Sequence, residues 1–141
     1  MRFECTLKYW ADDLESPNPR RKKFECVIAC EAATYGDAEM QATQWGMENI
    51  EEEFQVSPIK ELSVAGIYMH HTHEGKWFNM ACEFYVTEVN GKVKTNKINY
   101  LVQSGDQYEA LDRARQIMYE EGFEAFEIKK TTETKISLYL Y

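Results

Sequence analysis

The chain has 141 residues, of which 44 % are hydrophobic and 13 % aromatic, and this composition excludes an intrinsically disordered protein. Its net charge of −8 argues against a protein that coats duplex nucleic acid, because such a protein needs a basic surface. No apolar stretch reaches membrane-spanning length, and the segment MRFECTLKYW lacks the apolar centre of a secretory signal. We therefore expect a cytoplasmic protein with no membrane partner.

The first half of the chain predicts two strands, a helix and a closing strand segment. The opening segment alternates apolar and polar residues, which is typical of a half-buried strand, and its apolar positions are Phe3, Cys5, Leu7 and Tyr9. The proline-containing segment ADDLESPNPR separates it from a second predicted strand, KKFECVIACE. A helix is predicted over 35–52 with Thr34 as its N-cap, and the following segment is bent or split at Pro58.

The second half predicts the same order of elements. Its first strand has the apolar positions Phe78, Met80, Cys82 and Phe84. The dipeptide Asn90-Gly91 predicts a two-residue hairpin turn before the strand KTNKINYLVQ. A helix is predicted over 107–121, with Asp106 as its N-cap and Gly122 as its stop, and the segment FEIKKTTETKISLYLY closes the half.

An offset of about 72 to 75 residues brings these two series of elements into register. The sequence therefore predicts an α+β fold made by tandem duplication of a ββαβ unit, with a mainly antiparallel sheet, two helices and a pseudo-twofold relation. The repeats span 1–69 and 76–141, and residues 70–75 join them. One helix covers a sheet face poorly, so we expect one compact domain of two lobes.

The chain resembles an uncharacterised family of Bacteroidota and their phages, catalogued as domain of unknown function 4494. The resemblance rests on FECTLKY, TYGDAE and FQVSPIKELSVAGIY in the first half, and on KWF, NYLVQSGDQYEAL, FEIKKTTETKI and the closing tyrosine in the second. It covers nearly the whole chain and departs from the family at 12–19 and at 70–75. The resemblance implies a phage or prophage setting and transfers no catalytic residue.

Two groups of residues are candidates for metal or thiol chemistry. Cys5, Cys26, Cys30 and Cys82 form no C-x-x-C pair, so we expect reduced and mostly buried thiols. The run from His70 to Glu74 holds two imidazoles, His71 and His73, that point the same way if the segment is extended and with a carboxylate can hold zinc. A solvated linker explains this run better, so no metal, cofactor or catalytic residue is assigned.

Three surfaces are candidates for binding. The basic run of Arg20, Arg21, Lys22 and Lys23 beside an aromatic residue is a candidate contact for nucleic acid or a nucleotide, or a solvated sheet edge. Acidic residues at Asp12, Asp13, Glu15, Glu48 and 51–53 are candidates for imitating nucleic acid toward a basic host protein, or a solvated surface. The terminal strand is apolar on both faces, so we expect either the other half of the chain or a second molecule to cover it. Its candidate self-association or partner surface consists of Ile136, Leu138, Tyr139 and Tyr141.

Our leading hypothesis is a non-catalytic, phage-related binding protein that acts on a host protein or forms a homodimer. The alternative is a nucleic-acid or nucleotide-binding protein that works in phage replication or counters host defence. A continuous positive groove along Arg20–Lys23 with exposed aromatic rings distinguishes the alternative from the leading hypothesis.

Overall fold

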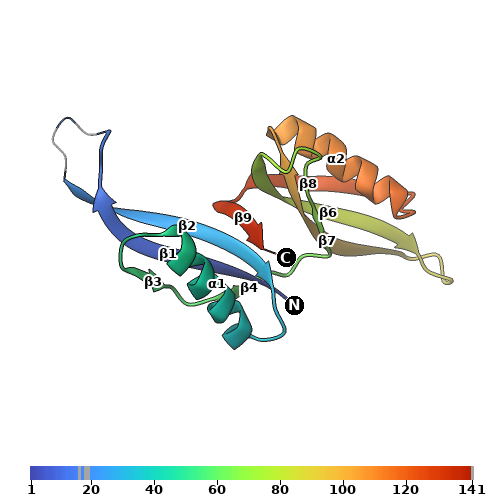
Figure 1. Cartoon of the computed structure of the whole chain (residues 1–141). Coiled ribbons are helices and arrows are strands. Elements are labelled where there is room, and N and C mark those ends of the chain that lie inside the picture. The colour runs from blue at the N-terminus through green and yellow to red at the C-terminus, as the bar shows by residue number, and fades with distance from the viewer. Residues whose placement is uncertain (16, 18–19, 141) are drawn as a thin grey trace. The chain divides into compact units, whose positions relative to one another are not determined.

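The computed structural model describes residues 1–15, 17 and 20–140, and the chain forms two compact units (Figure 1). Unit 1 contains Met1–Leu62 and the segment that begins at Ile136, and unit 2 contains Ser63–Lys135. Each unit has a mainly antiparallel sheet with one helix packed on it. The predicted α+β class is therefore confirmed.

The sheet of unit 1 is built around a long hairpin. Strands β1 (Arg2–Asp12) and β2 (Arg21–Glu31) pair antiparallel along their whole length. The short strands β3 (Phe54–Val56) and β4 (Lys60–Glu61) pair antiparallel with β1. On the other side β9 (Ile136–Leu140) pairs parallel with β2, so the order is β3-β1-β2-β9. The predicted break near Pro58 lies between β3 and β4.

Helix α1 (Tyr35–Asn49) covers one face of this sheet. The Thr34 side chain accepts a hydrogen bond from the Asp37 amide at 3.1 Å, which confirms the predicted N-cap. The helix ends before residue 52 because the backbone of Ile50 is extended. The acidic residues at 51–53 favour this earlier end, since carboxylates repel the negative C-terminus of a helix.

The core of unit 1 uses the alternating positions that the sequence predicts. The fully buried side chains on the face covered by α1 include Phe3, Cys5, Leu7, Ile28 and Cys30. They pack against the small residues Ala38 and Ala42 of the helix. Burial of apolar surface at about 25 cal/mol per Å² is the main force that holds the helix on the sheet.

Unit 2 is built around a second long hairpin. Strands β6 (Lys76–Thr87) and β7 (Val93–Ser104) pair antiparallel, and β8 (Phe126–Glu133) pairs antiparallel with β6. Strand β5 (Gly66–Tyr68) pairs parallel with β7, so the order is β5-β7-β6-β8. The core on the helix side contains Phe78, Met80, Cys82, Tyr100, Val102, Ala110, Ala114, Ile117 and Met118.

Helix α2 (Gln107–Glu120) has the predicted caps at both ends. Asp106 Oδ1 accepts a hydrogen bond from the Glu109 amide at 2.8 Å. At the C-terminus Gly122 adopts φ 89°, and the amides of Gly122 and Phe123 donate to the carbonyls of Tyr119 and Met118. This is a Schellman motif, which needs a left-handed residue directly after the helix. The helix ends one residue before the predicted limit of 121.

The turn between β6 and β7 is wider than the predicted two-residue turn. The Glu88 amide donates to the Lys92 carbonyl, and the Gly91 amide donates to the Glu88 carbonyl. Gly91 has φ 83°, whereas Asn90 does not have a positive φ. One left-handed residue suits a three-residue loop, and a two-residue turn of the favoured type needs two.

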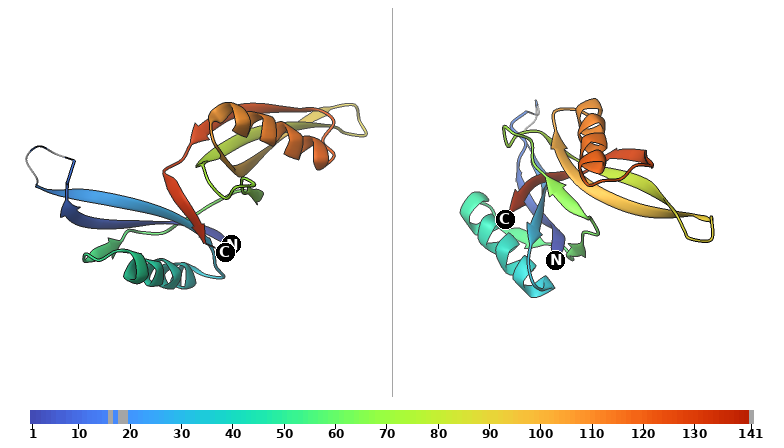
Figure 2. Two further views of the ribbon diagram at one scale, coloured as in Figure 1. Left: turned by 45° about the horizontal axis from the view of Figure 1, so that its top comes forward. Right: turned by 90° about the vertical axis from the view of Figure 1, so that its right-hand side faces the viewer.

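The two units exchange the last strands of the sequence halves (Figure 2). Strand β5 lies in the first half of the sequence and completes the sheet of unit 2, whereas β9 lies in the second half and completes the sheet of unit 1. The compact units therefore differ from the sequence halves 1–69 and 76–141. The predicted joint at 70–75 lies inside unit 2 and connects β5 to β6.

The predicted burial of the cysteines is confirmed. Cys5, Cys30 and Cys82 are buried, Cys26 is half-buried, and none of the four is in a disulfide. Burial raises the pKa of the Cys5 thiol to about 12 and that of Cys82 to about 11. Both thiols therefore stay protonated at neutral pH and act as small hydrophobic side chains.

Candidate functional site

A groove on unit 1 brings an aromatic side chain together with charges of both signs. Trp10 lies on β1, on the face opposite Phe3, Cys5 and Leu7, because side chains alternate along a strand. Its side chain is 55 % exposed. The groove has a volume of about 1070 Å³ and is lined by Lys8, Trp10, Arg21, Lys23, Glu51, Glu52, Glu53, Phe54 and Gln55. We call it the Trp10 groove.

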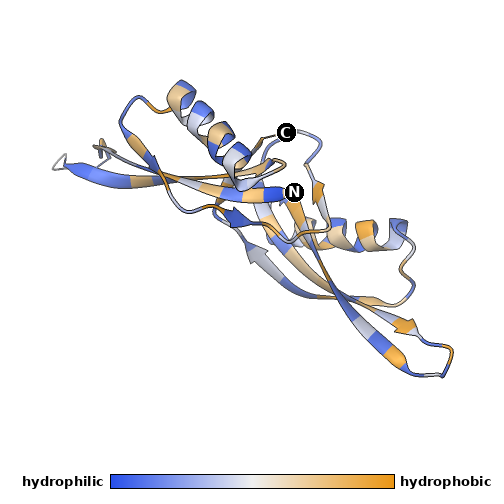
Figure 3. Cartoon of the chain, turned by 90° about the horizontal axis from the view of Figure 1, so that it is seen from below, coloured by the Kyte–Doolittle hydropathy of each residue, from blue (hydrophilic) through white to orange (hydrophobic). Residues whose placement is uncertain are grey.

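One wall of the Trp10 groove is formed by the β1–β2 hairpin. Lys23 lies directly opposite Trp10 in the antiparallel register, and the Arg21 guanidinium donates to the Trp10 carbonyl at 3.0 Å. The Nζ atoms of Lys8 and Lys23 lie 4.0 and 3.9 Å from Glu25 Oε1. These ion pairs are exposed, so they contribute little to stability and leave the ammonium groups accessible to a ligand. Figure 3 shows the end of the β1–β2 hairpin that lies away from the N-terminus as largely hydrophilic.

The opposite wall is acidic. Strand β3 pairs with β1 so that Phe54 lies beside Tyr9 and Gln55 beside Lys8. This pairing brings the preceding residues Glu51, Glu52 and Glu53 to the groove. The groove therefore presents three carboxylates to a ligand along with the cations of the hairpin.

The predicted basic run is divided between the two faces of the hairpin. Arg21 and Lys23 line the Trp10 groove, whereas Lys22 lies with its Nζ 5.9 Å from the centroid of the Phe24 ring. Arg20 precedes β2, and its carbonyl accepts a hydrogen bond from the Asp13 amide. The four cations do not form a continuous positive groove along the run.

The C-terminal strand is a part of the unit 1 sheet. Ile136 and Tyr139 are buried, and Leu138 is half-buried. Burial raises the pKa of the Tyr139 hydroxyl to about 12, and Glu31 adds to this shift. Tyr141 lies outside the described residues. Self-association through this strand stays a prediction, and the two buried side chains offer little accessible area for it.

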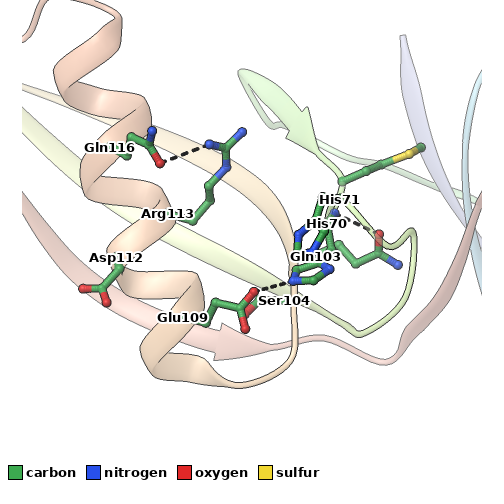
Figure 4. Close-up of a pocket in the computed structure, with 9 residues that line it drawn as sticks. His70, His71, Gln103, Ser104, Glu109, Asp112, Arg113 and Gln116 are labelled. Atoms are coloured by element: carbon green, nitrogen blue, oxygen red, sulfur yellow. Dashed lines mark hydrogen bonds and ion pairs between the residues drawn. The ribbon is translucent and has the colours of Figure 1, made fainter.

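Unit 2 has a smaller polar cavity at the start of α2, shown in Figure 4. Its volume is about 400 Å³, and it is lined by Met69, His70, His71, Gln103, Ser104, Glu109, Asp112, Arg113 and Gln116. The last four residues project from α2, and the histidines come from the loop after β5. Arg113 Nη1 donates to Gln116 Oε1 at 3.2 Å.

The polar groups of this cavity form hydrogen bonds and an ion pair with neighbouring residues of unit 2. The Thr72 amide donates to His70 Nδ1 at 3.2 Å, and His70 Nε2 lies 2.6 Å from Glu109 Oε1. The Ser104 hydroxyl donates to the Asp106 carbonyl at 2.7 Å and accepts from the Asp106 amide. Both groups therefore hydrogen-bond within the turns beside the cavity.

The histidine run forms a tight turn. The His73 amide donates to the His70 carbonyl, and His73 adopts φ 57°. Gln103 accepts from the His70 amide and donates to the His73 carbonyl, so it holds the turn from β7. No group of three or more possible metal ligands is found among the described residues.

Comparison with known proteins identifies a family for the chain. The family model described as "Domain of unknown function (DUF4494)" matches residues 1–139. The chain belongs to this family. The family's description states no activity, so membership in DUF4494 assigns none to the chain. No curated protein and no solved structure matches it.

The described part of this DUF4494 chain has no helix with the length and apolar character needed to cross a membrane. Sequence reasoning identified Arg21 and Lys23 as site candidates but missed Trp10. The signal was present, since the alternation that buries Cys5 and Leu7 directs Trp10 to the other face.

Proposed function

We propose that this protein is a non-catalytic binding protein that recognises a polypeptide partner through the Trp10 groove. The observation that carries the proposal is an exposed tryptophan between cations of one wall and carboxylates of the other. Tryptophan is enriched among the residues that dominate binding energy, because it offers a large, rigid surface and a hydrogen-bond donor. The groove supplies a place for one aromatic or apolar side chain of the partner.

The mixed charge of the groove favours a polypeptide over a nucleic acid. A phosphate chain that contacts Lys8, Arg21 and Lys23 has to pass the carboxylates at 51–53, which repel it. A polypeptide with both basic and acidic side chains complements both walls. The partner is a host protein or a second copy of this chain.

A nucleic-acid or nucleotide ligand is the second candidate. Three cations around an exposed ring resemble the stacking surfaces that bind single strands. For a nucleic acid, the affinity has to fall as the salt concentration rises and has to depend on Trp10. The carboxylates of the acidic wall repel phosphates and instead favour a positively charged ligand.

The repeat organisation also belongs to this proposal. We infer that the chain arose by tandem duplication of a ββαβ unit with a pseudo-twofold relation, in a phage or prophage setting. Support comes from equal strand registers. Ile28 pairs with Leu138 in unit 1, and Tyr100 pairs with Gly66 in unit 2. Tyr100 follows Ile28 by 72 residues (100 − 28), and Leu138 follows Gly66 by the same 72 (138 − 66), so the two parallel pairings have the same register.

Photo-crosslinking tests the proposed function directly. The residue p-benzoylphenylalanine is placed at Trp10, and at Tyr119 of α2 as a control with a 78 % exposed side chain. In cells that carry the native gene, we expect a protein adduct at position 10 and none at position 119. Light scattering against the chain mass of 16.6 kDa separates self-association from a foreign partner. A nucleotide adduct at position 10, or the same adducts at both positions, contradicts the proposal.

A further inference from the structure

The outward face of α1 carries an apolar stripe. Gly36, Met40, Thr43 and Met47 follow helical spacing and lie on one side of the helix. The side chains of Met40 and Met47 are 71 % and 74 % exposed. They form a shallow hollow of about 670 Å³ together with Gly36, Glu39, Thr43, Gln44 and Glu48. The opposite side of α1 is occupied by the core, through Ala38 and Ala42.

Helix α2 provides an internal comparison, because its N-cap side chain makes the equivalent hydrogen bond and it packs on the corresponding sheet. Counted from the N-cap, the equivalent residues of α2 are Tyr108, Asp112, Arg115 and Tyr119. There an ion pair joins Asp112 and Arg115, with Nη1 and Oδ1 3.5 Å apart. A charged centre is what a solvated helix face normally has. The methionine in place of Asp112 therefore gives the α1 face an apolar centre where the α2 face has a charged one, although α2 also exposes Tyr108 and Tyr119.

The surroundings of the stripe carry one sign of charge. No lysine, arginine or histidine occurs between residues 32 and 59. Glu39 and Glu48 border the hollow, and the carboxylates at 51–53 follow the end of the helix. The C-terminus of α1 adds the negative end of its dipole, with no basic residue in the last turn. A partner that covers this face needs apolar side chains flanked by positive charge.

We propose that the outward face of α1 docks a basic amphipathic helix of another protein. Methionine side chains are flexible and polarisable, so they adapt to the apolar side chains of such a helix. Gly36 and Thr43 are small residues, so the partner helix approaches closely at these positions. Glu39 and Glu48 pair with the cations of the partner. This face is separate from the Trp10 groove, because α1 packs on the opposite face of the unit 1 sheet.

The test uses a fluorescent synthetic helix with leucines at i, i+3, i+4 and i+7 and lysines elsewhere. A peptide of the same composition in scrambled order controls for charge alone. Binding is measured by fluorescence anisotropy, and the contact surface is mapped by amide chemical shifts. We expect the amphipathic peptide to bind and to shift the resonances of Met40, Thr43 and Met47, while the scrambled peptide binds at least about tenfold more weakly.

Variants at exposed positions make the test specific without disturbing the core. Met40→Lys combined with Met47→Lys is expected to lower the affinity at least about tenfold, through lost contacts and charge repulsion. Met40→Leu with Met47→Leu retains binding, as do Tyr119→Lys on α2 and Trp10→Ala in the Trp10 groove. Equal binding of the scrambled peptide, no binding of the amphipathic peptide, or unchanged affinity in the double lysine variant overturns the proposal. Retained binding in Trp10→Ala separates it from the function of that groove.

Discussion

The Tyr68 hydroxyl donates a hydrogen bond to Glu121 Oε1 at 2.9 Å, and the Tyr100 hydroxyl donates to Oε2 of the same carboxylate at 3.1 Å. Tyr68 lies on β5, which comes from the first half of the chain, whereas Glu121 and Tyr100 come from the second half. The carboxylate at the end of α2 therefore holds the exchanged strand in the sheet of unit 2. The rings of Tyr68 and Tyr100 also make an edge contact at 5.7 Å.

Tyr68→Phe is expected to lower the free energy of unfolding by about 1 kcal/mol, because it removes one hydrogen bond to a charged acceptor and keeps the ring. Urea denaturation followed by circular dichroism measures the change. Tyr119→Phe on α2 is the control, since its side chain is largely exposed. Equal stability of Tyr68→Phe and the parent chain contradicts a role for this hydrogen bond in holding β5.

The strand exchange predicts how the chain behaves when it is divided. Fragments 1–73 and 74–141 each lack one strand of the sheet that holds their hairpin, since β9 completes unit 1 and β5 completes unit 2. We expect neither fragment to fold as a monomer, and a mixture to form an equimolar complex with the spectrum of the intact chain. Parallel edge strands supply part of the buried apolar surface that a small sheet needs.

The control for the divided chain carries a protease site between His73 and Glu74, both of which are exposed. Cleavage after folding leaves the two pieces associated in size-exclusion chromatography under native conditions, because no strand pairing is lost. A stable folded monomer formed by fragment 1–73 alone contradicts the prediction.

The exchange also shows where sequence reasoning reaches its limit. Alternation in β1 and β6 correctly identified the buried positions Phe3, Cys5, Phe78 and Met80. Alternation of apolar and polar residues indicates which face of a strand is buried, but it does not indicate which strand lies beside it. The apolar pattern of β5 and β9 was therefore readable, whereas their partners β7 and β2 were not.

The same limit applies to the candidate site. Arg21 and Lys23 were predicted from a local basic run, and local runs are visible in a sequence. The carboxylates at 51–53 reach the same groove only because β3 pairs with β1, which is a long-range pairing. The helix caps at Thr34 and Asp106 and the stop at Gly122 were correctly predicted because each depends on a few adjacent residues.

Gly46→Ala is expected to destabilise the protein, although alanine normally favours a helix by about 1 kcal/mol over glycine. A Cβ atom at Gly46 lies only 2.5 Å from Cζ of Phe54, which packs against α1 from β3. Moving this ring costs about 1 to 3 kcal/mol, as overpacked cores do. Thermal and urea denaturation measure the difference.

The same helix offers the control for Gly46→Ala. A Cβ atom at Gly36 meets nothing closer than the Thr34 hydroxyl at 3.7 Å, so Gly36→Ala is expected to leave stability unchanged or to raise it. Phe54→Leu in the Gly46→Ala background recovers part of the loss, since it removes the ring atoms that clash. A Gly46→Ala chain as stable as Gly36→Ala contradicts this account of the packing between α1 and β3.

Stability is expected to fall in alkaline solution because several buried groups keep their protons only in the folded chain. The pKa values of the Cys5 and Cys82 thiols rise from 9.0 to about 12 and about 11 by burial. Their unfolded forms lose a proton near pH 9, so deprotonation favours unfolding above that pH. The contribution of these thiols is complete below pH 9 and is lost as the pH rises through 11 and 12.

The double variant Cys5→Ala, Cys82→Ala isolates this effect from other alkaline titrations. It is less stable than the parent at pH 7 because two apolar contacts are lost, but its stability falls less steeply between pH 9 and pH 11. Urea midpoints at several pH values measure both slopes. Cys26→Ala removes a half-buried thiol from the edge of the core and provides the matched control. Parallel slopes for the parent and the double variant contradict the burial of protonated thiols, as does rapid labelling of Cys5 or Cys82 by a thiol reagent before unfolding.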